Sequence, residues 1–297
     1  MLMTGTAIDT ILSSLNRNKK RETGRAGGTC DFIKTRAGCI RFIDTNSDKP
    51  VLLTTPDAPC VIEHHLALID QLSQSFRVIC FEMPGSGFSY PSAKYSFKIA
   101  ETADMILEFM DGLGIDKAAL AFTCVNGLHA MNFASRFPDR VSHLALAQVP
   151  SASAMRDWTG HNVPTPLRIP YIGQIIGRFS AKILAERWFS MSLPRPCEHR
   201  APMTHIALEN MKSGGCFCLS SIVQGAERTP DEAMLGASAP TIMIYGDTDY
   251  SHRHTDFNTI TETVPQAALI KYQGYGHFPH LERTDEYVSD LIKFVLN

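Results

Sequence analysis

Three side chains of this 297-residue sequence have the types that nucleophilic catalysis needs: Cys124, Asp249 and His277. Cys124 follows a strand-like apolar run at 118–122 and precedes a helical pattern at 128–136. A thiol at the start of a helix lies where the helix dipole favours an anion, so a neighbouring histidine can make it a reactive thiolate. The alternative is a buried, inert cysteine, and position alone does not decide between the two.

The segment around Cys124 resembles the G-x-S-x-G turn of the α/β-hydrolase fold superfamily. Cys124 stands in the serine position, while Phe122 and Asn126 stand in the two glycine positions. The strand-like run 241–245 continues as G-D-T-D, which is similar to the family's G-x-x-D and ends at Asp249. The element G-H-F-P-H-L-E is similar to the one that presents the family's histidine, here His277.

The order of nucleophile, acid and histidine is the order that this family requires. The resemblance therefore implies a catalytic triad of Cys124, His277 and Asp249, in which the carboxylate orients the imidazole and the imidazole serves the thiol. Asp247 and His280 remain the less favoured alternatives for the acid and the base.

The expected fold is an α/β fold with a mostly parallel central sheet, helices on both faces and a helical lid insertion. Strand-like runs alternate with helical patterns from residue 30 to about 150, and the alternation resumes near 241. E-M-P-G-S-G-F-S resembles the family's loop after the fourth strand, with Glu82 in place of aspartate. We expect a helical extension at 1–28, a core formed by 29–149 and 237–297, and a proline-punctuated lid at 150–236.

The oxyanion hole departs from the family pattern. The amide of Val125 is the expected first donor, but the usual His-Gly pair of the second loop is replaced by Thr-Thr-Pro-Asp at 54–57. Proline has no N–H, so Thr55 or Asp57 is the candidate for the second donor. A carboxylate at Asp57 repels an oxyanion unless it points away. We therefore expect poor hydrolysis of simple activated esters.

The candidates for contact with substrate are aromatic. Trp158 and Trp188 lie in the expected lid, where they either line an apolar pocket or pack the lid on the sheet. Phe122, next to the nucleophile turn, replaces a small residue and implies a rearranged packing there.

Composition indicates a protein without nucleic-acid or membrane partners, because the net charge is −2 and no apolar run reaches about 20 residues. Eight scattered cysteines suggest reduced thiols and a cytoplasmic location. We expect no metal, since Cys216 and Cys218 lack a second pair at zinc-site spacing. No cofactor is expected either, because no helix opens at the glycine-rich loop 82–89 to bind a phosphate.

The favoured function is acyl transfer on a small-molecule ester, thioester or lactone through a Cys124 thioester, ending in hydrolysis, cyclisation or transfer. The alternative is a protein of the same fold that binds a small molecule without hydrolysing it, or that performs lyase-type proton chemistry with His277. The altered oxyanion loop favours the alternative. The three triad residue types in register favour the enzyme.

Overall fold

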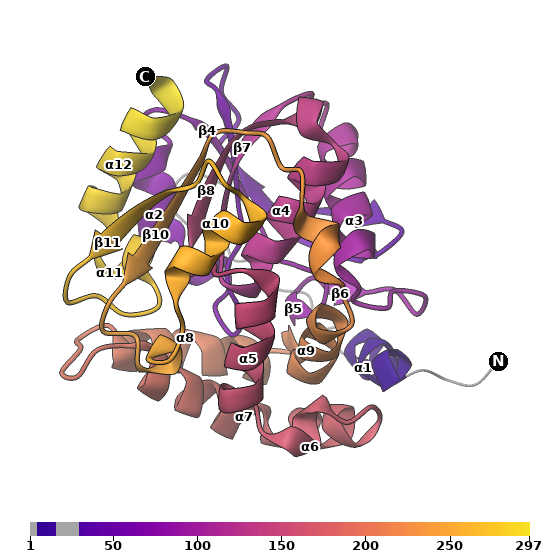
Figure 1. The fold of residues 1–297 in the computed structure, drawn as a ribbon. Helices are drawn as coiled ribbons and strands as arrows, with labels where there is room; N and C mark the ends of the chain where they lie inside the picture. Colours follow the sequence, from indigo (N-terminus) through magenta and orange to yellow (C-terminus); the bar gives the residue numbers. More distant parts are fainter. Residues whose placement is uncertain (1–4, 16–29) are drawn as a thin grey trace.

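The computed structural model describes residues 5–15 and 30–297, and its centre is a nine-stranded sheet (Figure 1). The strands lie in the order β1-β2-β4-β3-β7-β8-β10-β11, with β6 beside β2. The pairs β1–β2, β2–β4 and β2–β6 are antiparallel, whereas β4 to β11 form a parallel series. The strands are β1 Asp31–Thr35, β2 Gly38–Asp44, β3 Val51–Thr54, β4 Arg77–Phe81, β6 Tyr90–Pro91, β7 Ala118–Thr123, β8 Val141–Ala147, β10 Thr241–Gly246 and β11 Ala268–Tyr272. The expected fold class is confirmed.

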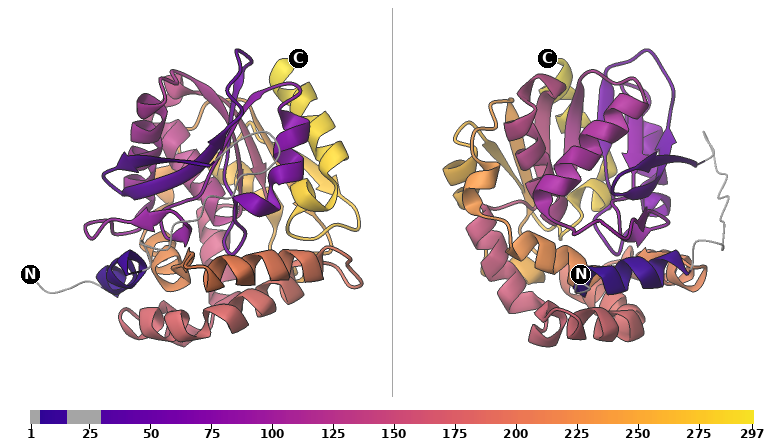
Figure 2. Two further views of the ribbon diagram at one scale, coloured as in Figure 1. Left: turned by 180° about the vertical axis from the view of Figure 1, so that it is seen from behind. Right: turned by 90° about the vertical axis from the view of Figure 1, so that its right-hand side faces the viewer.

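Helices cover both faces of this sheet, as Figures 1 and 2 show. On one face lie α3 (Ile99–Gly112) and α4 (Val125–Arg136), and on the other lie α2 (Leu66–Leu72) and α12 (Thr284–Leu296). Both faces of the sheet are apolar because each is covered by helices. In the β7 strand, alternate residues accordingly pack into the two hydrophobic cores on opposite faces of the sheet. Leu120 and Phe122 belong to the core under α3 and α4, while Ala119 and Ala121 belong to the opposite one.

The segment between β8 and β10 forms helices beyond the carboxyl ends of the parallel strands (Figures 1 and 2). They are α5 Ala152–Asn162, α6 Thr165–Arg168, α7 Ile172–Ser192, α8 Arg200–Lys212 and α9 Leu219–Glu227. The short strands β5 (Ser86–Gly87) and β9 (Cys216–Phe217) pair and tie this segment to the loop after β4. The division into a core and a lid at 150–236 remains our proposal.

The N-terminal helix α1 (Gly5–Ser14) packs on α7 and α9. Residues 16–28 of the expected extension lie outside the described residues.

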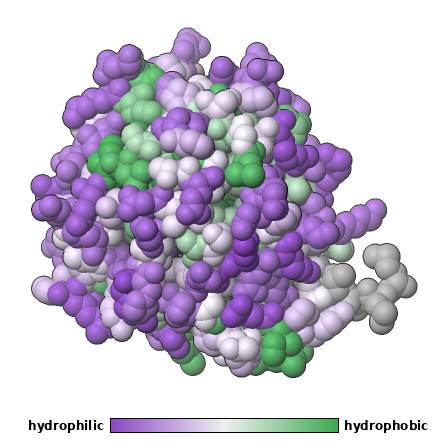
Figure 3. Space-filling model, viewed as in Figure 1, coloured by the Kyte–Doolittle hydropathy of each residue, from purple (hydrophilic) through white to green (hydrophobic). Residues whose placement is uncertain are grey.

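The outer face of α7 is apolar, with 86% of Phe179 and 66% of Ile183 exposed. The view in Figure 3 is mainly hydrophilic, with hydrophobic side chains in several separate patches, one of them at its lower edge. Within the described chain, no helix has the length and apolarity that crossing a bilayer requires.

Two helices differ from the expected boundaries. The helix after Cys124 begins at Val125, not at residue 128, because the chain turns sharply at Cys124 and enters the helix at once. The stretch 61–72 is divided into a 3₁₀ turn, Ile62–His64, and the helix α2. Asn126 and Gly127 are weak helix formers, so their tertiary contacts override propensity there.

The loop after β4 is organised around the fully buried Glu82. Its carboxylate lies 3.1 Å from Nη1 of the buried Arg41 and accepts hydrogen bonds from the amides of Phe88 at 2.7 Å and Ile62 at 3.3 Å. Burial raises the pKa of Glu82 to about 7, although the charge of Arg41 opposes the rise. Gly87 has φ +53°, and a Cβ there would lie 2.3 Å from Glu82 Cδ, so this turn requires glycine.

We expect Glu82→Ala to lower the free energy of unfolding by about 3 kcal/mol, because it removes one of the two carboxylates that, among the described residues, pair with the buried guanidinium of Arg41. Urea unfolding followed by circular dichroism measures the loss. Asp104→Ala is the control, since it breaks the half-exposed pair with Arg136 and should hardly move the midpoint. Equal effects of the two substitutions would contradict this role of Glu82.

Candidate active site

Cys124 occupies the sharp turn between β7 and α4. Its φ of 53° and ψ of −131° are unusual for a residue with a side chain, and its amide donates to the carbonyl of Ala147 at 2.8 Å. Gly127 permits the turn because a Cβ there would lie 2.3 Å from Cγ2 of Val149. The strained turn directs the thiol to the carboxyl edge of the sheet, where it is 1% exposed.

His277 and Asp249 meet at this edge. His277 Nδ1 lies 2.6 Å from Oδ2 of Asp249, and both side chains are buried. Asp249 also accepts hydrogen bonds from Gln148 Nε2 at 2.9 Å and from the amide and hydroxyl of Ser251 at 2.8 and 2.7 Å. Burial alone raises the pKa of Asp249, but the charge and hydrogen bond of His277, together with the hydrogen bond from the Ser251 side chain, outweigh burial and lower it. The sulfur of Cys124 and a ring nitrogen of His277 lie within 4.8 Å of each other.

The alternative acid and base lie elsewhere. Asp247 accepts the amide of Gly274 at 2.7 Å and lies 3.1 Å from Lys271 Nζ, outside the cluster. His280 is buried against His65, with ring centroids 5.3 Å apart. The G-x-x-D register thus brings Asp249, and not Asp247, to His277.

Asp57 approaches the same imidazole from its other side. Its Oδ2 lies 3.4 Å from Nε2 of His277, so the carboxylate points toward the candidate triad instead of away from it. Burial lowers the pKa of His277, but Asp249, Cys124 and Asp57 together raise it well above its usual value. From the sequence, Asp57 is expected to contribute its amide, and the direction of its side chain is open.

The thiol is therefore not a preformed thiolate. Burial, and after it the charge of Asp57, raise the pKa of Cys124 to about 11, although His277 and the amide of Val125 favour the charged form. The expectation of a lowered thiol pKa is wrong for this site. Enclosure by protein and a neighbouring carboxylate outweigh the helix dipole.

Of the three residues expected to supply oxyanion donors, two line the pocket and one does not. Val125 and Asp57 line the pocket, whereas Thr55 is buried and does not line it. Asn126 Nδ2 donates to the carbonyl of Pro56 at 3.1 Å and so joins the loops that carry Val125 and Asp57. In the sequence, Asn126 is visible only as a replacement for glycine, because nothing local indicates its partner 70 residues away.

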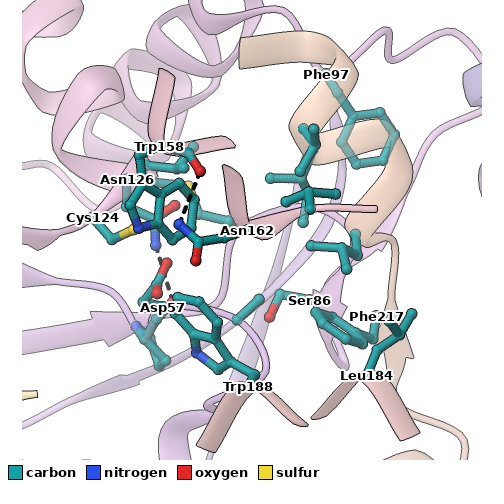
Figure 4. Close-up of a pocket in the computed structure, with 18 of the residues that line it drawn as sticks. Asp57, Ser86, Phe97, Cys124, Asn126, Trp158, Asn162, Leu184, Trp188 and Phe217 are labelled. Carbon is teal, nitrogen blue, oxygen red and sulfur yellow. Dashed lines mark hydrogen bonds between the residues drawn. The ribbon is translucent and has the colours of Figure 1, made fainter. Parts of the chain in front are cut away.

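The pocket above Cys124 has a volume of about 100 Å³ and mainly apolar walls. Trp158 and Trp188 line it, as expected for substrate contacts, and in Figure 4 Cys124, Asp57 and Trp158 lie at the end opposite Phe97 and Phe217. Phe122 does not line this pocket, contrary to its candidate role. Its ring packs in the core against Phe81, with centroids 5.8 Å apart, because β7 turns that side chain under the sheet.

A second histidine, His252, completes the cluster and was not found in the sequence. Its ring stacks on Trp158 at 5.1 Å and on His277 at 5.3 Å between centroids. Nδ1 lies 3.0 Å from Thr255 Oγ1. Burial, and then the charge of His277, lower the pKa of His252 to about 3, although Asp249 opposes them. His252 is therefore neutral, with one ring nitrogen available to a neighbour.

Comparison with known proteins finds hydrolases among the proteins whose sequences are similar to this one. A family model described as the alpha/beta hydrolase fold matches residues 61–284. An epoxide hydrolase of Caenorhabditis elegans is 26% identical over 48% of this chain and 36% of its own length. A pimeloyl-acyl-carrier protein methyl ester esterase of Aliivibrio salmonicida is 20% identical over 77% of this chain and 85% of its own length. The matches to the two epoxide hydrolases found span little more than a third of their length.

Solved structures share the whole architecture at low identity. A putative acyltransferase from Salmonella enterica superimposes with a TM-score of 0.78 at 15% identity, over 93% of this chain and 98% of that one. Epoxide hydrolase A from Mycobacterium thermoresistibile gives 0.75 at 17% identity, over 91% and 98%. These likenesses concern the fold.

Proposed function

Because this chain belongs to the alpha/beta hydrolase fold family, we propose that it is an enzyme that transfers the acyl group of an ester, thioester or lactone through Cys124. The observation that supports this most is the juxtaposition at the sheet edge. His277 bonds Asp249 through Nδ1 and lies beside the sulfur of Cys124, which the strained turn presents to the pocket. This arrangement supports the proposed roles of Cys124 as nucleophile, His277 as base and Asp249 as orienting acid.

The cysteine itself favours acyl substrates over epoxides. A sulfur that opens an epoxide forms a thioether, whose C–S bond water does not cleave, so the enzyme would stop after one event. A sulfur that attacks an ester forms a thioester, which water, an amine or an alcohol cleaves. The relation to a methyl ester esterase over most of both chains agrees with this choice. The relation to epoxide hydrolases then reflects shared architecture.

The charges around His277 set the order of proton transfers. Nε2 of His277 can accept the thiol proton only while this nitrogen carries no proton. Asp57, whose Oδ2 lies 3.4 Å away, is the neighbour that can hold a proton in its place, because burial raises the pKa of this carboxyl group. A protonated Asp57 also ceases to repel an oxyanion, and the amide of Val125 is the proposed donor to that oxyanion. The imidazolium then returns its proton to the leaving group, and the acyl group stays on sulfur.

A trapped acyl-enzyme tests the proposal. We expect quenched reactions with a butyryl thioester to show the mass of one butyryl group on the Cys124 peptide, whereas Cys124→Ala gives no adduct and no turnover. Cys216→Ala, another buried cysteine, is the matched control and should behave as wild type. Styrene oxide should alkylate Cys124 once without forming diol. Turnover by Cys124→Ala would overturn the covalent mechanism.

The second candidate is proton-transfer chemistry of the lyase type, with His277 as the acid or base. The observation that favours it is Asp57, which stabilises a protonated His277 while the thiol pKa is raised. In that case Cys124→Ala retains turnover and His277→Ala loses it, so the same variants separate the two functions.

A further inference from the structure

Cys124, His252 and His277 together have the composition of a metal site. We propose that they bind a thiophilic divalent cation, for which Zn²⁺ is the probe, and that the cation reversibly blocks the nucleophile. One ligand atom from each residue lies within 4.8 Å of the other two, and all three residues are buried. Metal binding would act on the proposed enzyme as a regulatory step that its catalytic cycle does not need.

The outer contacts of both histidines are those of metal ligands. His277 uses Nδ1 for Asp249 and leaves Nε2 for the interior of the cluster. His252 uses Nδ1 for Thr255 Oγ1, and its buried Nε2 has no hydrogen-bond partner among the described residues. A histidine that binds metal through one nitrogen and a carboxylate or hydroxyl through the other has its tautomer and orientation set in advance. Both imidazoles are therefore already oriented for a shared ion.

The donor set selects the kind of cation. One sulfur and two imidazole nitrogens suit Zn²⁺ and disfavour Mg²⁺ and Ca²⁺, which prefer oxygen. Tetrahedral zinc holds such ligand atoms roughly 3.3–3.8 Å apart, so the cluster has to contract by about 1 Å at its widest separation. Asp57, 3.4 Å from His277 Nε2, adds the negative charge that a buried dication needs.

The binding step balances in charge and protons. The cation reaches Cys124 through the pocket that this residue lines. The sulfur–hydrogen bond breaks and a sulfur–metal bond forms, and His277, whose pKa is raised, loses the proton on Nε2 so that this nitrogen can bind the cation. Both protons pass to solvent. The sulfur and the lone pairs of two imidazole nitrogens then occupy three coordination positions of the cation. While the ion is bound, the sulfur lone pair is engaged and cannot attack a substrate or an alkylating reagent.

The test measures binding directly on tag-free protein, without reference to turnover. We expect one Zn²⁺ per chain by competition with a chromophoric chelator, a thiolate-to-metal charge-transfer band with Co²⁺, and no binding of Mg²⁺. Zn²⁺ should protect Cys124 from iodoacetamide, and EDTA should restore the labelling. His252→Phe keeps a ring between Trp158 and His277 but lacks the nitrogen, and should weaken Zn²⁺ binding at least about tenfold.

His280→Phe is the matched control, since it removes a buried histidine outside the cluster and should leave zinc affinity unchanged. Wild-type protein alkylated at Cys124 should lose the cobalt band, which tests the site even if His252→Phe fails to fold. Equal affinity of wild type and His252→Phe, or zinc binding without protection of Cys124, would overturn the site. Neither result bears on the acyl-enzyme, which the adduct experiment decides separately.

Discussion

His277→Ala is expected to lower kcat/KM for an acyl substrate by about 10⁴-fold or more, with little change in the free energy of unfolding. The imidazole of His277, which Asp249 holds beside the sulfur, is the group proposed both to accept the thiol proton and to deliver it to the leaving group. Asp249→Asn should cost about 10⁴-fold as well, because an amide in place of the Oδ2 that bonds Nδ1 at 2.6 Å favours the wrong tautomer. Steady-state rates with a thioester substrate measure both losses.

Asp247→Asn is the matched control for this pair of predictions. Asp247 lies two residues before the acid, but it bonds Gly274 and Lys271 on the surface, so its change should cost less than about tenfold. Circular dichroism and urea unfolding check that each variant is folded. A folded Asp247→Asn protein that loses more activity than Asp249→Asn would show that the acid has been assigned to the wrong carboxylate.

Asp57→Asn is expected to make Cys124 more reactive, by about tenfold at pH 8. Removing the negative charge lowers the pKa of the thiol from about 11, and each unit of lowering raises the thiolate fraction about tenfold at a pH below the pKa. In wild type, alkylation of Cys124 should keep rising from pH 7 to pH 10, because the thiolate forms only as the pH approaches the pKa. In Asp57→Asn, the rise of the alkylation rate with pH should occur at a lower pH than in wild type.

The control is Asp57→Glu, which keeps a carboxylate near His277 and should not accelerate alkylation. Rates come from mass spectrometry of the Cys124 peptide after timed exposure to iodoacetamide. Cys60, which is also buried near Asp57, serves as an internal reference for general loosening of the fold, since unfolding would expose both thiols. A wild-type rate that is already maximal at pH 7 would mean that Cys124 is a thiolate at rest, against the charge arrangement described here.

The parallel sheet and its order of elements were predictable from the sequence. The alternation of apolar strands and amphipathic helices is a local pattern. A strand that is buried on both faces has a continuous apolar sequence whichever strands it pairs with. The register of Asp249 was predictable for a similar reason, because a short motif sets how far the acid lies beyond the end of its strand. Helix boundaries were less predictable where a sharp turn, as at Cys124, starts the helix early.

Side-chain direction and electrostatics were decided only by the tertiary structure. Whether Asp57 faces His277 or solvent depends on how the loop after β3 meets the loop that carries His277, more than 200 residues away. The pKa of Cys124 depends on the burial that the surrounding segments create together. Phe122 was assigned to the pocket, but it still lies within β7 and packs in the core, whereas the sharp turn at Cys124 directs the thiol to the sheet edge.

The types and chain order of Cys124, Asp249 and His277 thus follow from the sequence alone, because motif spacing within a strand and its turn is local. The charge state of that site, and the presence of His252 in it, follow from packing. Coulomb energy and desolvation depend on distances between segments that are remote in sequence, and no local pattern records those distances.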